Sequence, residues 1–367
     1  MEAPTRPSVI APAGPRLRIG YSFWGFLTSG VLDTPDGGRG YRRSVIDALQ
    51  AAGHHVVLVQ ANRDLTEAGI DLAGLYRFDD GLPDLDAIIY EWRWPLDGRN
   101  TTACGTPGHT CDLHRQQQLL DHYTHKRGVP SVIWDQDRWL PSDDPLRAQP
   151  NVRVAEYALR PTSGAVTVAC PVPDDLLDFA DAQQLARESR DLRLVYVGNQ
   201  YGRDDAFGHY FAPAAARVPH LVAGKWVEVD RWPQVRFTGR CRFEEVASIH
   251  RRALATVLLL PERYRRVGHQ TSRLFESIVN GCLPLTPADT ACAERFTPPS
   301  LHVRSSDEVV DRIRWIESIA GTEEHAALIR ECLDLLDPYR TSRQAAALIA
   351  VLHDLAGAAR PDSVRRC

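Results

Sequence analysis

GHQTSRLFESIVNGCLP, residues 268–284, has the pattern of a loop, a short helix and a buried strand. Thr271 or Ser272 can cap the helix, because a hydroxyl accepts a hydrogen bond from the free N–H groups of a first turn. Apolar residues follow at helical spacing, and Gly281 stands where many helices end in the left-handed conformation. One acid, Glu276, lies about a turn inside. The stretch therefore predicts a short helix that carries a single carboxylate.

An apolar strand precedes this helix. Residues 254–261 read LATVLLLP, and the loop between strand and helix carries Arg263, Arg265 and Arg266. A strand, a basic loop and a helix in this order are typical of an open α/β sheet, which binds anionic ligands at the carboxyl ends of its strands. We expect a diphosphate to meet backbone N–H and guanidinium groups here. The alternative is a solvated basic loop.

The same alternation extends over the whole chain. Predicted strands alternate with helical segments and lie at residues 17–23, 55–60, 86–92, 130–137, 152–158, 165–171, 193–199, 234–240 and 254–261. This order predicts an α/β protein with mostly parallel sheets, and 367 residues favour two domains. We predict a disordered arm at 1–16, domains at 17–172 and 191–338, a linker at 173–190, and a C-terminal helix and tail at 339–367.

The run RLFESIVNGCLPLT, residues 273–286, resembles the donor-binding signature of GT-B glycosyltransferases, nearest the retaining, spore-maturation-protein-like branch. The resemblance implies two Rossmann-like domains that face each other across a cleft, with a C-terminal crossover helix. It implies transfer of a sugar from a nucleoside-diphosphate sugar to a small-molecule acceptor, with retention of configuration and without a metal or other cofactor. Many relatives carry an acid eight residues before Glu276, where this sequence has Gly268.

The resemblance also assigns donor and catalytic residues by position. Glu276 takes the place of the acid that binds the donor ribose, and a basic residue such as Arg203 neutralises the leaving diphosphate. The implied donor-binding residues are Glu276, Arg273, Thr271, Ser272, Gly268, Arg266, Gly198 and Asn199, and the implied catalytic residues are Arg203, Lys225 and His269. The alternative for Arg203 is a surface ion pair with Asp204 or Asp205.

Polar groups at strand ends of the first domain are candidates for acceptor recognition. The predicted acceptor-binding residues are Gly38, Arg39, Glu91, Asp135, Asp137 and His109. A pair of aspartates such as Asp135 and Asp137 can hold a divalent metal, but we predict acceptor contacts and no metal site. If the configuration is inverted instead, the candidate bases are His109, His114, Asp135 and Asp137.

Four residues with zinc-binding side chains fall within residues 104–114, CGTPGHTCDLH. They are Cys104, His109, Cys111 and His114. Their spacing differs from the paired CxxC arrangement, so we predict a polar loop that lines the cleft. A structural zinc site and a labile disulfide are the alternatives.

Composition excludes several classes of function. A net charge of −4 and a pI near 6.4 argue against a nucleic-acid partner, and lysine occurs only at positions 126 and 225. Neither a signal peptide nor a stretch of membrane-spanning length is evident, so we expect a cytoplasmic protein with reduced thiols and no membrane insertion.

Two other functions compete with sugar transfer. A catalytically silent GT-B homologue that binds a nucleotide or a partner protein is the main alternative, because Gly268 replaces an acid. A nicotinamide oxidoreductase is disfavoured, because Gln60 stands where an acid is needed at the end of the second strand and the glycine fingerprint is missing.

Overall fold

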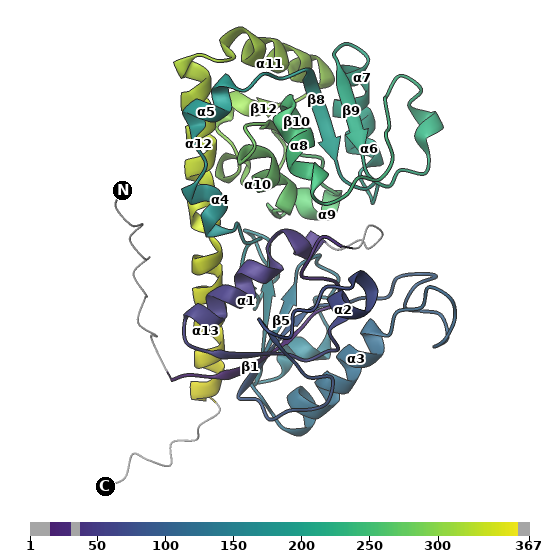
Figure 1. The fold of residues 1–367 in the computed structure, drawn as a ribbon, viewed down its shortest axis with the longest axis vertical. Helices are drawn as coiled ribbons and strands as arrows, with labels where there is room; N and C mark the ends of the chain where they lie inside the picture. Colours follow the sequence, from purple (N-terminus) through teal and green to yellow (C-terminus); the bar gives the residue numbers. More distant parts are fainter. Residues whose placement is uncertain (1–14, 31–36, 359–367) are drawn as a thin grey trace.

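The computed structural model describes residues 15–30 and 37–358. The predicted N-terminal arm lies outside the described residues except for residues 15 and 16. Two separate parallel sheets make up the fold, one above the other in Figure 1. None of the described helices is long and apolar enough to cross a membrane.

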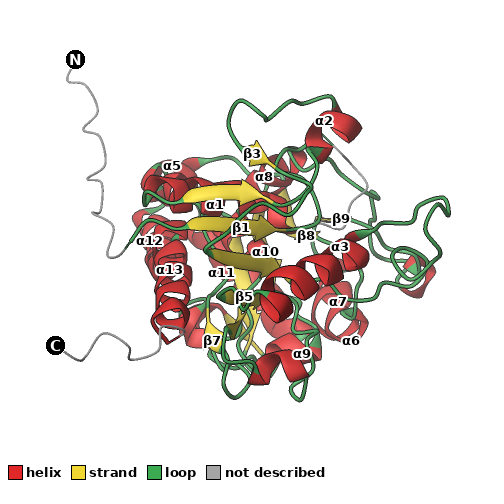
Figure 2. Cartoon of the chain, turned by 90° about the horizontal axis from the view of Figure 1, so that it is seen from below, coloured by secondary structure: helices red, strands yellow, loops and turns green. Residues whose placement is uncertain are grey.

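The first sheet has seven strands in the order β3-β2-β1-β4-β5-β6-β7. Every neighbouring pair is parallel, because helices or long loops connect the strands. Figure 2 shows these strands side by side from β3 to β7. Their bounds are β1 Arg18–Ser22, β2 His55–Leu58, β3 Arg77–Phe78, β4 Ala87–Glu91, β5 Ser131–Asp135, β6 Val152–Glu156 and β7 Val166–Thr167.

Amphipathic helices cover the first sheet. In α1, Val45, Ile46 and Leu49 are buried, as the helical spacing predicts. Leu119, Leu120 and Tyr123 are buried where α3 continues into a π-helical turn. The helices of this part are η1 Gly37–Gly40, α1 Arg42–Ala51, α2 Arg63–Ala68, α3 Asp112–Leu119, the π-helical η2 Leu120–Lys126 and η3 Pro145–Ala148.

The second sheet has five parallel strands in the order β12-β11-β10-β8-β9. The predicted strand at 234–240 is wrong: this segment runs along β9, where the N–H of Val222 donates to the carbonyl of Arg236, but it forms one isolated bridge, between Phe237 and Val222, and no strand. The strands are β8 Leu192–Val197, β9 His220–Ala223, β10 Ala253–Val257, β11 Leu283–Pro287 and β12 His302–Val303. The helices around them are α6 Asp204–Ala206, the π-helical η4 Phe207–Phe211, α7 Ala212–Ala215, η5 Val229–Arg231, α8 Glu245–Arg251, α9 Glu262–Arg265, α10 Ser272–Ile278, η6 Ala293–Arg295, η7 Pro299–Leu301 and α11 Ser306–Ile319.

Helix α10 follows the predicted pattern. Thr271 is its N-cap residue in extended conformation but makes no side-chain cap hydrogen bond. Gly281 ends the turn with φ of 68°, and the N–H groups of Gly281 and Cys282 donate to the carbonyls of Ile278 and Ser277. This positive φ strains L side chains, and a Cβ here would also displace the Arg190 guanidinium, so the position favours glycine.

The last helix returns to the first sheet. Helix α13 (Thr341–Ala358) continues from α12 (Glu323–Leu336) through η8 (Asp337–Tyr339) and lies along the lower part of the molecule in Figure 1. The Thr341 hydroxyl lies 3.0 Å from that of Ser44 on α1, and Gln344 accepts the N–H of Ala169 at 2.9 Å. These contacts confirm the crossover helix. The segment between the sheets holds α4 Asp174–Asp178 and α5 Ala182–Arg187.

Candidate functional site

Loops at the carboxyl ends of the two sheets meet each other. Arg138, just after β5, donates to the carbonyl of Arg263 at 3.2 Å. The hydroxyl of Tyr264 bonds Asp137, and the N–H of Leu159 donates to the carbonyl of Gly268 at 3.1 Å. Because parallel α/β sheets bind ligands beyond the carboxyl ends of their strands, this junction is the candidate site.

The guanidinium of Arg273 lies against the backbone of Gly198, which in turn packs against Gly224. A Cβ at Gly198, directly after β8, would stand 2.8 Å from Nη1 of Arg273, and a Cβ at Gly224 would collide with the carbonyl oxygen of Gly198. The Arg273 guanidinium lies 5.7 Å from the centre of the Tyr196 ring. In the described part of the chain, Arg273 forms no ion pair and no hydrogen bond. A half-buried cation at a strand end is thus available to an anionic ligand.

Glu276 lies one turn along the same helix and faces the first domain. A Cβ at Gly40 would stand 3.3 Å from its Oε1 and 3.7 Å from the ring of Phe243. Burial raises the pKa of Glu276, and the positive charge of Arg273 and the Ser272 hydroxyl oppose this shift. The turn η1 (Gly37–Gly40) of the first domain and Glu276 of the second domain are therefore parts of one site.

The aromatic ring of Phe243 is a site residue that the sequence did not single out. The guanidinium of Arg39 lies 5.6 Å from its ring centre, which brings Gly38 and Arg39 to the same place as Glu276. Phe243 lies in the turn before α8, which begins two residues later, at Glu245. The sequence could have indicated Phe243 only as a large aromatic residue that follows the strand-like segment 234–240.

Arg203 has a different role from the predicted one. It is buried, and its guanidinium donates to the carbonyls of Leu259 at 3.1 Å, Asn199 at 3.2 Å and Tyr201 at 2.8 Å. Burial lowers its pKa to about 10, and the nearby charge of Arg273 adds to this effect. The side chain shapes the loop after β8, so we move the proposed diphosphate contact from Arg203 to Arg273.

The other basic candidates lie at the surface or have partners. Lys225 is exposed, and its backbone N–H donates to Oδ1 of Asn199 at 2.8 Å. Arg266 is exposed and pairs with Glu262 four residues before it. Arg266 directly follows a short helix, α9, in a segment expected as a loop, because Pro261 starts a helical turn there.

His269 and Gly268 lie at the contact between the two domains. The imidazole of His269 is 1% exposed and stacks on the ring of Tyr264, with ring centres 3.8 Å apart. Burial lowers its pKa well below the usual value, and the charges of Arg138 and Arg263 add to the effect. Gly268 has φ of 61°, and a Cβ there would stand 2.8 Å from the carbonyl of Ala291. An acid cannot occupy position 268 without moving this backbone.

Two predicted acceptor-binding carboxylates are buried inside the first domain. Glu91 is 2% exposed and accepts two hydrogen bonds from Arg42, at 2.8 and 2.6 Å, and one from Tyr21 at 2.8 Å. Asp135 is fully buried and accepts the N–H groups of Trp139 and Leu140, and burial raises its pKa to about 6. Both carboxylates hold the first domain together and have no surface left for a ligand.

Two predicted acceptor-binding residues remain, Asp137 at the junction and His109 in a loop. Asp137 accepts the hydroxyl of Tyr264, so it belongs to the contact between the domains. His109 lies in the loop after β4 together with Cys104, Cys111 and His114.

A buried histidine behind α10 predicts a pH dependence of stability. His250 is 1% exposed, and burial, with the charge of Arg273, lowers its pKa to about 4. The imidazole of His250 takes up a proton near pH 6.5 in the unfolded chain but only near pH 4 in the folded chain. The folded state therefore keeps its full stability above pH 6.5 and loses part of it as the pH falls from 6.5 to 4. We expect a loss on the order of 3 kcal/mol, measured by urea unfolding between pH 7 and 4.

The control is the slope of stability against pH in two variants. His250→Gln should flatten the slope, whereas His125→Gln, at an exposed position, should leave it unchanged. Asp135 changes the stability in the opposite direction, because its raised pKa favours the folded state at low pH. Wild type and both variants contain Asp135, so its effect does not enter the difference between their slopes. Equal slopes in wild type and His250→Gln would contradict the prediction.

Several solved structures with a similar fold are glycosyltransferases. The T4 phage BGT structure in complex with UDP and Mn²⁺ matches with a TM-score of 0.62 and 12% identity, over 91% of this chain and 99% of that chain. AviGT4, a glycosyltransferase involved in avilamycin A biosynthesis, matches with 0.56 and 14%, over 94% and 99%. Anabaena HepE in complex with UDP-glucose matches with 0.53 and 11%, over 92% and 100%.

At these identities the likeness shows the fold, which is GT-B, with two Rossmann-like domains and a crossover helix. No protein-family model matches the sequence, and no curated protein matches it.

Proposed function

We propose that this GT-B protein transfers a sugar from a nucleoside-diphosphate sugar, which the second domain holds. The observation that carries the proposal is Arg273, a half-buried guanidinium that lies over Gly198, one turn before Glu276, and forms no ion pair or hydrogen bond within the described residues. A cation and a carboxylate at this spacing suit the two ends of a nucleoside diphosphate, the phosphates and the ribose hydroxyls. The names of the solved structures support the same class, since two of them hold UDP or UDP-glucose.

The proposed donor contacts follow from this arrangement. Glu276 accepts hydrogen bonds from the ribose hydroxyls, and Arg273 binds the diphosphate beside the backbone of Gly198 and Asn199. The hydroxyls of Thr271 and Ser272, at the start of α10, lie next to these groups. Arg266 and Lys225 stay candidates for the outer edge of the donor. The chemistry is then stabilisation of the departing diphosphate by a positioned positive charge, with the acceptor held for attack on the anomeric carbon.

We propose a small-molecule acceptor, bound by the first domain around Gly38 and Arg39. One of the matched structures is a DNA-modifying β-glucosyltransferase. The net charge of −4 here disfavours a DNA acceptor, because phosphate binding needs clustered positive charge. A biosynthetic role in specialised metabolism, retention of configuration, the spore-maturation-protein-like branch and independence of metal belong to the same proposal.

A catalytically silent homologue is the second candidate. It is favoured by the backbone at Gly268, which leaves no room for an acid, and by the buried carboxylates of Glu91 and Asp135, which have no surface for a substrate. Such a protein would bind a nucleotide without transferring sugar.

A thermal-shift screen against UDP, GDP, dTDP and ADP, with and without EDTA, tests the donor site. A nucleotide at 100 times its Kd should add about 2.7 kcal/mol of stability. We expect one nucleotide to stabilise wild type, equally with EDTA, and to lose its effect in Glu276→Ala but not in the surface variant Glu262→Ala. No stabilisation by any of them would overturn the proposed donor site, and a shift abolished by EDTA would overturn the metal independence.

Turnover separates the two candidate functions. Incubation with the sugar form of the stabilising nucleotide, followed by mass spectrometry, should show slow donor hydrolysis even without the acceptor. If the protein binds the nucleotide but does not cleave the sugar nucleotide, even with a panel of acceptors present, it is the silent homologue.

A further inference from the structure

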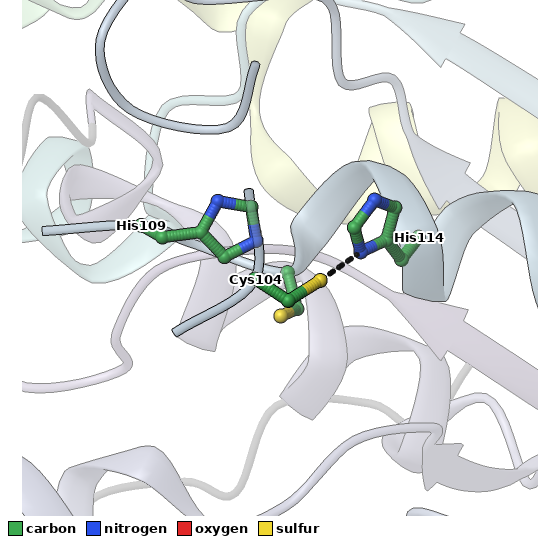
Figure 3. A group of neighbouring side chains, drawn as sticks. Cys104, His109 and His114 are labelled. Carbon is green, nitrogen blue, oxygen red and sulfur yellow. Dashed lines mark hydrogen bonds between the residues drawn. The ribbon is translucent and has the colours of Figure 1, made fainter. Parts of the chain in front are cut away.

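Four potential metal ligands converge in the loop that follows β4. Cys104, His109 and Cys111 lie in this loop and His114 in the first turns of α3, and one ligand atom from each lies within 4.8 Å of all the others. Figure 3 shows the Cys104 sulfur directed at the ring of His114, with His109 beside them. The Sγ of Cys104 is 3.2 Å from Nδ1 of His114, and the two imidazole centres are 5.6 Å apart.

These distances suit a tetrahedral zinc ion. Bonds of about 2.3 Å to sulfur and about 2.0–2.1 Å to nitrogen place tetrahedral ligand atoms roughly 3.3–3.8 Å from one another. The ligand atoms here are already within 4.8 Å, so small side-chain rotations close the cage. Two thiols and two imidazoles are soft or borderline ligands, which select zinc over the oxygen-seeking Mg²⁺ and Ca²⁺.

The surroundings of His109 point independently to a ligand. Its Nδ1 lies 3.1 Å from the hydroxyl of Thr102, a contact that orients the ring, as second-shell partners of metal-bound histidines do. Its Nε2 is buried and has no hydrogen-bond partner among the described residues. A buried nitrogen without a partner costs free energy, and a bound cation would satisfy it.

Apolar burial does not hold the shape of this loop. Residues 103–108 are all exposed and include Gly105 and Gly108 with φ of 86° and 80°. Hydrogen bonds of Asp112 to Arg93, Asn100 and Thr110 hold the base of the loop, and its outer part has short-range backbone bonds such as that from the N–H of His109 to the carbonyl of Thr106. A loop without a buried apolar anchor gains most from a metal clip.

We propose that Cys104, His109, Cys111 and His114 bind one structural Zn²⁺ that orders the loop between β4 and α3. Binding replaces the two thiol protons, which are released to solvent, by two Zn–S bonds, and adds two Zn–N bonds. All four positions are filled by protein, so the ion is structural and has no open site for catalysis. The loop begins at the carboxyl end of β4, and the ion therefore supports the edge of the first domain that faces the candidate site.

Metal analysis of the full-length chain, purified through a tag without histidines, tests the site. We expect about one zinc per chain by mass spectrometry of the metal in wild type. The double variant Cys104→Ser, Cys111→Ser should lose the zinc, and Cys241→Ser, a cysteine outside the cluster, should keep it. His109→Gln should also lose affinity, whereas His125→Gln should not, and circular dichroism verifies that each variant is folded.

Wild type alone provides a second readout that needs no variant. Protein stripped of metal and titrated with Co²⁺ should develop the visible absorption of tetrahedral cobalt with thiolate charge-transfer bands, saturating at about one equivalent. Zinc content that is equal in wild type and double variant, or an octahedral cobalt spectrum, would overturn the proposal. So would an intact mass two hydrogens lower without metal, which would assign Cys104 and Cys111 to a disulfide.

Discussion

Glu91→Ala is expected to lower the free energy of unfolding by about 3–5 kcal/mol, the cost of removing one partner of a buried ion pair. Glu91 and Arg42 are 2% and 1% exposed and form two hydrogen bonds at 2.6 and 2.8 Å. Without the carboxylate, the guanidinium of Arg42 keeps its charge in the core, and the hydroxyl of Tyr21 loses its acceptor. Urea unfolding of wild type and variant measures the difference.

Two controls separate this stability effect from acceptor binding. Asp84→Ala breaks an exposed pair with Arg127 at 2.9 Å and should cost less than about 1 kcal/mol. Glu91→Gln keeps the shape but removes the charge, and it should still cost several kcal/mol. A Glu91→Ala protein of wild-type stability that no longer turns over would return Glu91 to the acceptor site.

Arg273→Ala is expected to reduce kcat about 100- to 1,000-fold, the usual effect of removing one group that stabilises charge in a transition state. Its guanidinium lies over Gly198 and forms no ion pair or hydrogen bond in the described part of the chain, so little stability should be lost with it. Steady-state turnover of the sugar nucleotide identified by the thermal-shift screen measures the effect.

The conservative variant tests how Arg273 acts. Arg273→Lys keeps the charge but not the planar fork, and should recover part of the lost rate. Arg314→Ala, an exposed residue of α11 paired with Asp311, is the matched control and should be unchanged. Equal kcat values for Arg273→Ala and wild type would place the departing diphosphate elsewhere, with Arg266 and Lys225 as the next candidates.

Local sequence patterns predicted the fold class and the elements around the candidate site. Helical spacing in residues 273–279 predicted α10, and Gly281 ends its last turn with φ of 68°. Regular alternation of strands and helices predicted two parallel sheets. These features depend on residues within one turn or one strand of each other, and such short-range preferences can be read directly from the sequence. The two-residue strands and the edge strand β9 were harder, because pairing decides them more than local propensity.

Tertiary contacts decided which polar side chains face a ligand. Glu91, Asp135 and Arg203 have the residue types of a site, but the folded chain buries all three. Glu91 pairs with Arg42 and Arg203 donates to the carbonyl of Leu259, both far along the chain, whereas Asp135 accepts the N–H groups of the loop that follows it. Gly40 and Glu276, 236 positions apart by number, meet because the two domains turn the same ends of their sheets toward each other. Local residue patterns set which helices and strands form and which positions carry charge. Only the folded chain determined which charges are already satisfied, because that depends on partners brought together by long-range packing and on the high cost of leaving a buried charge unpaired.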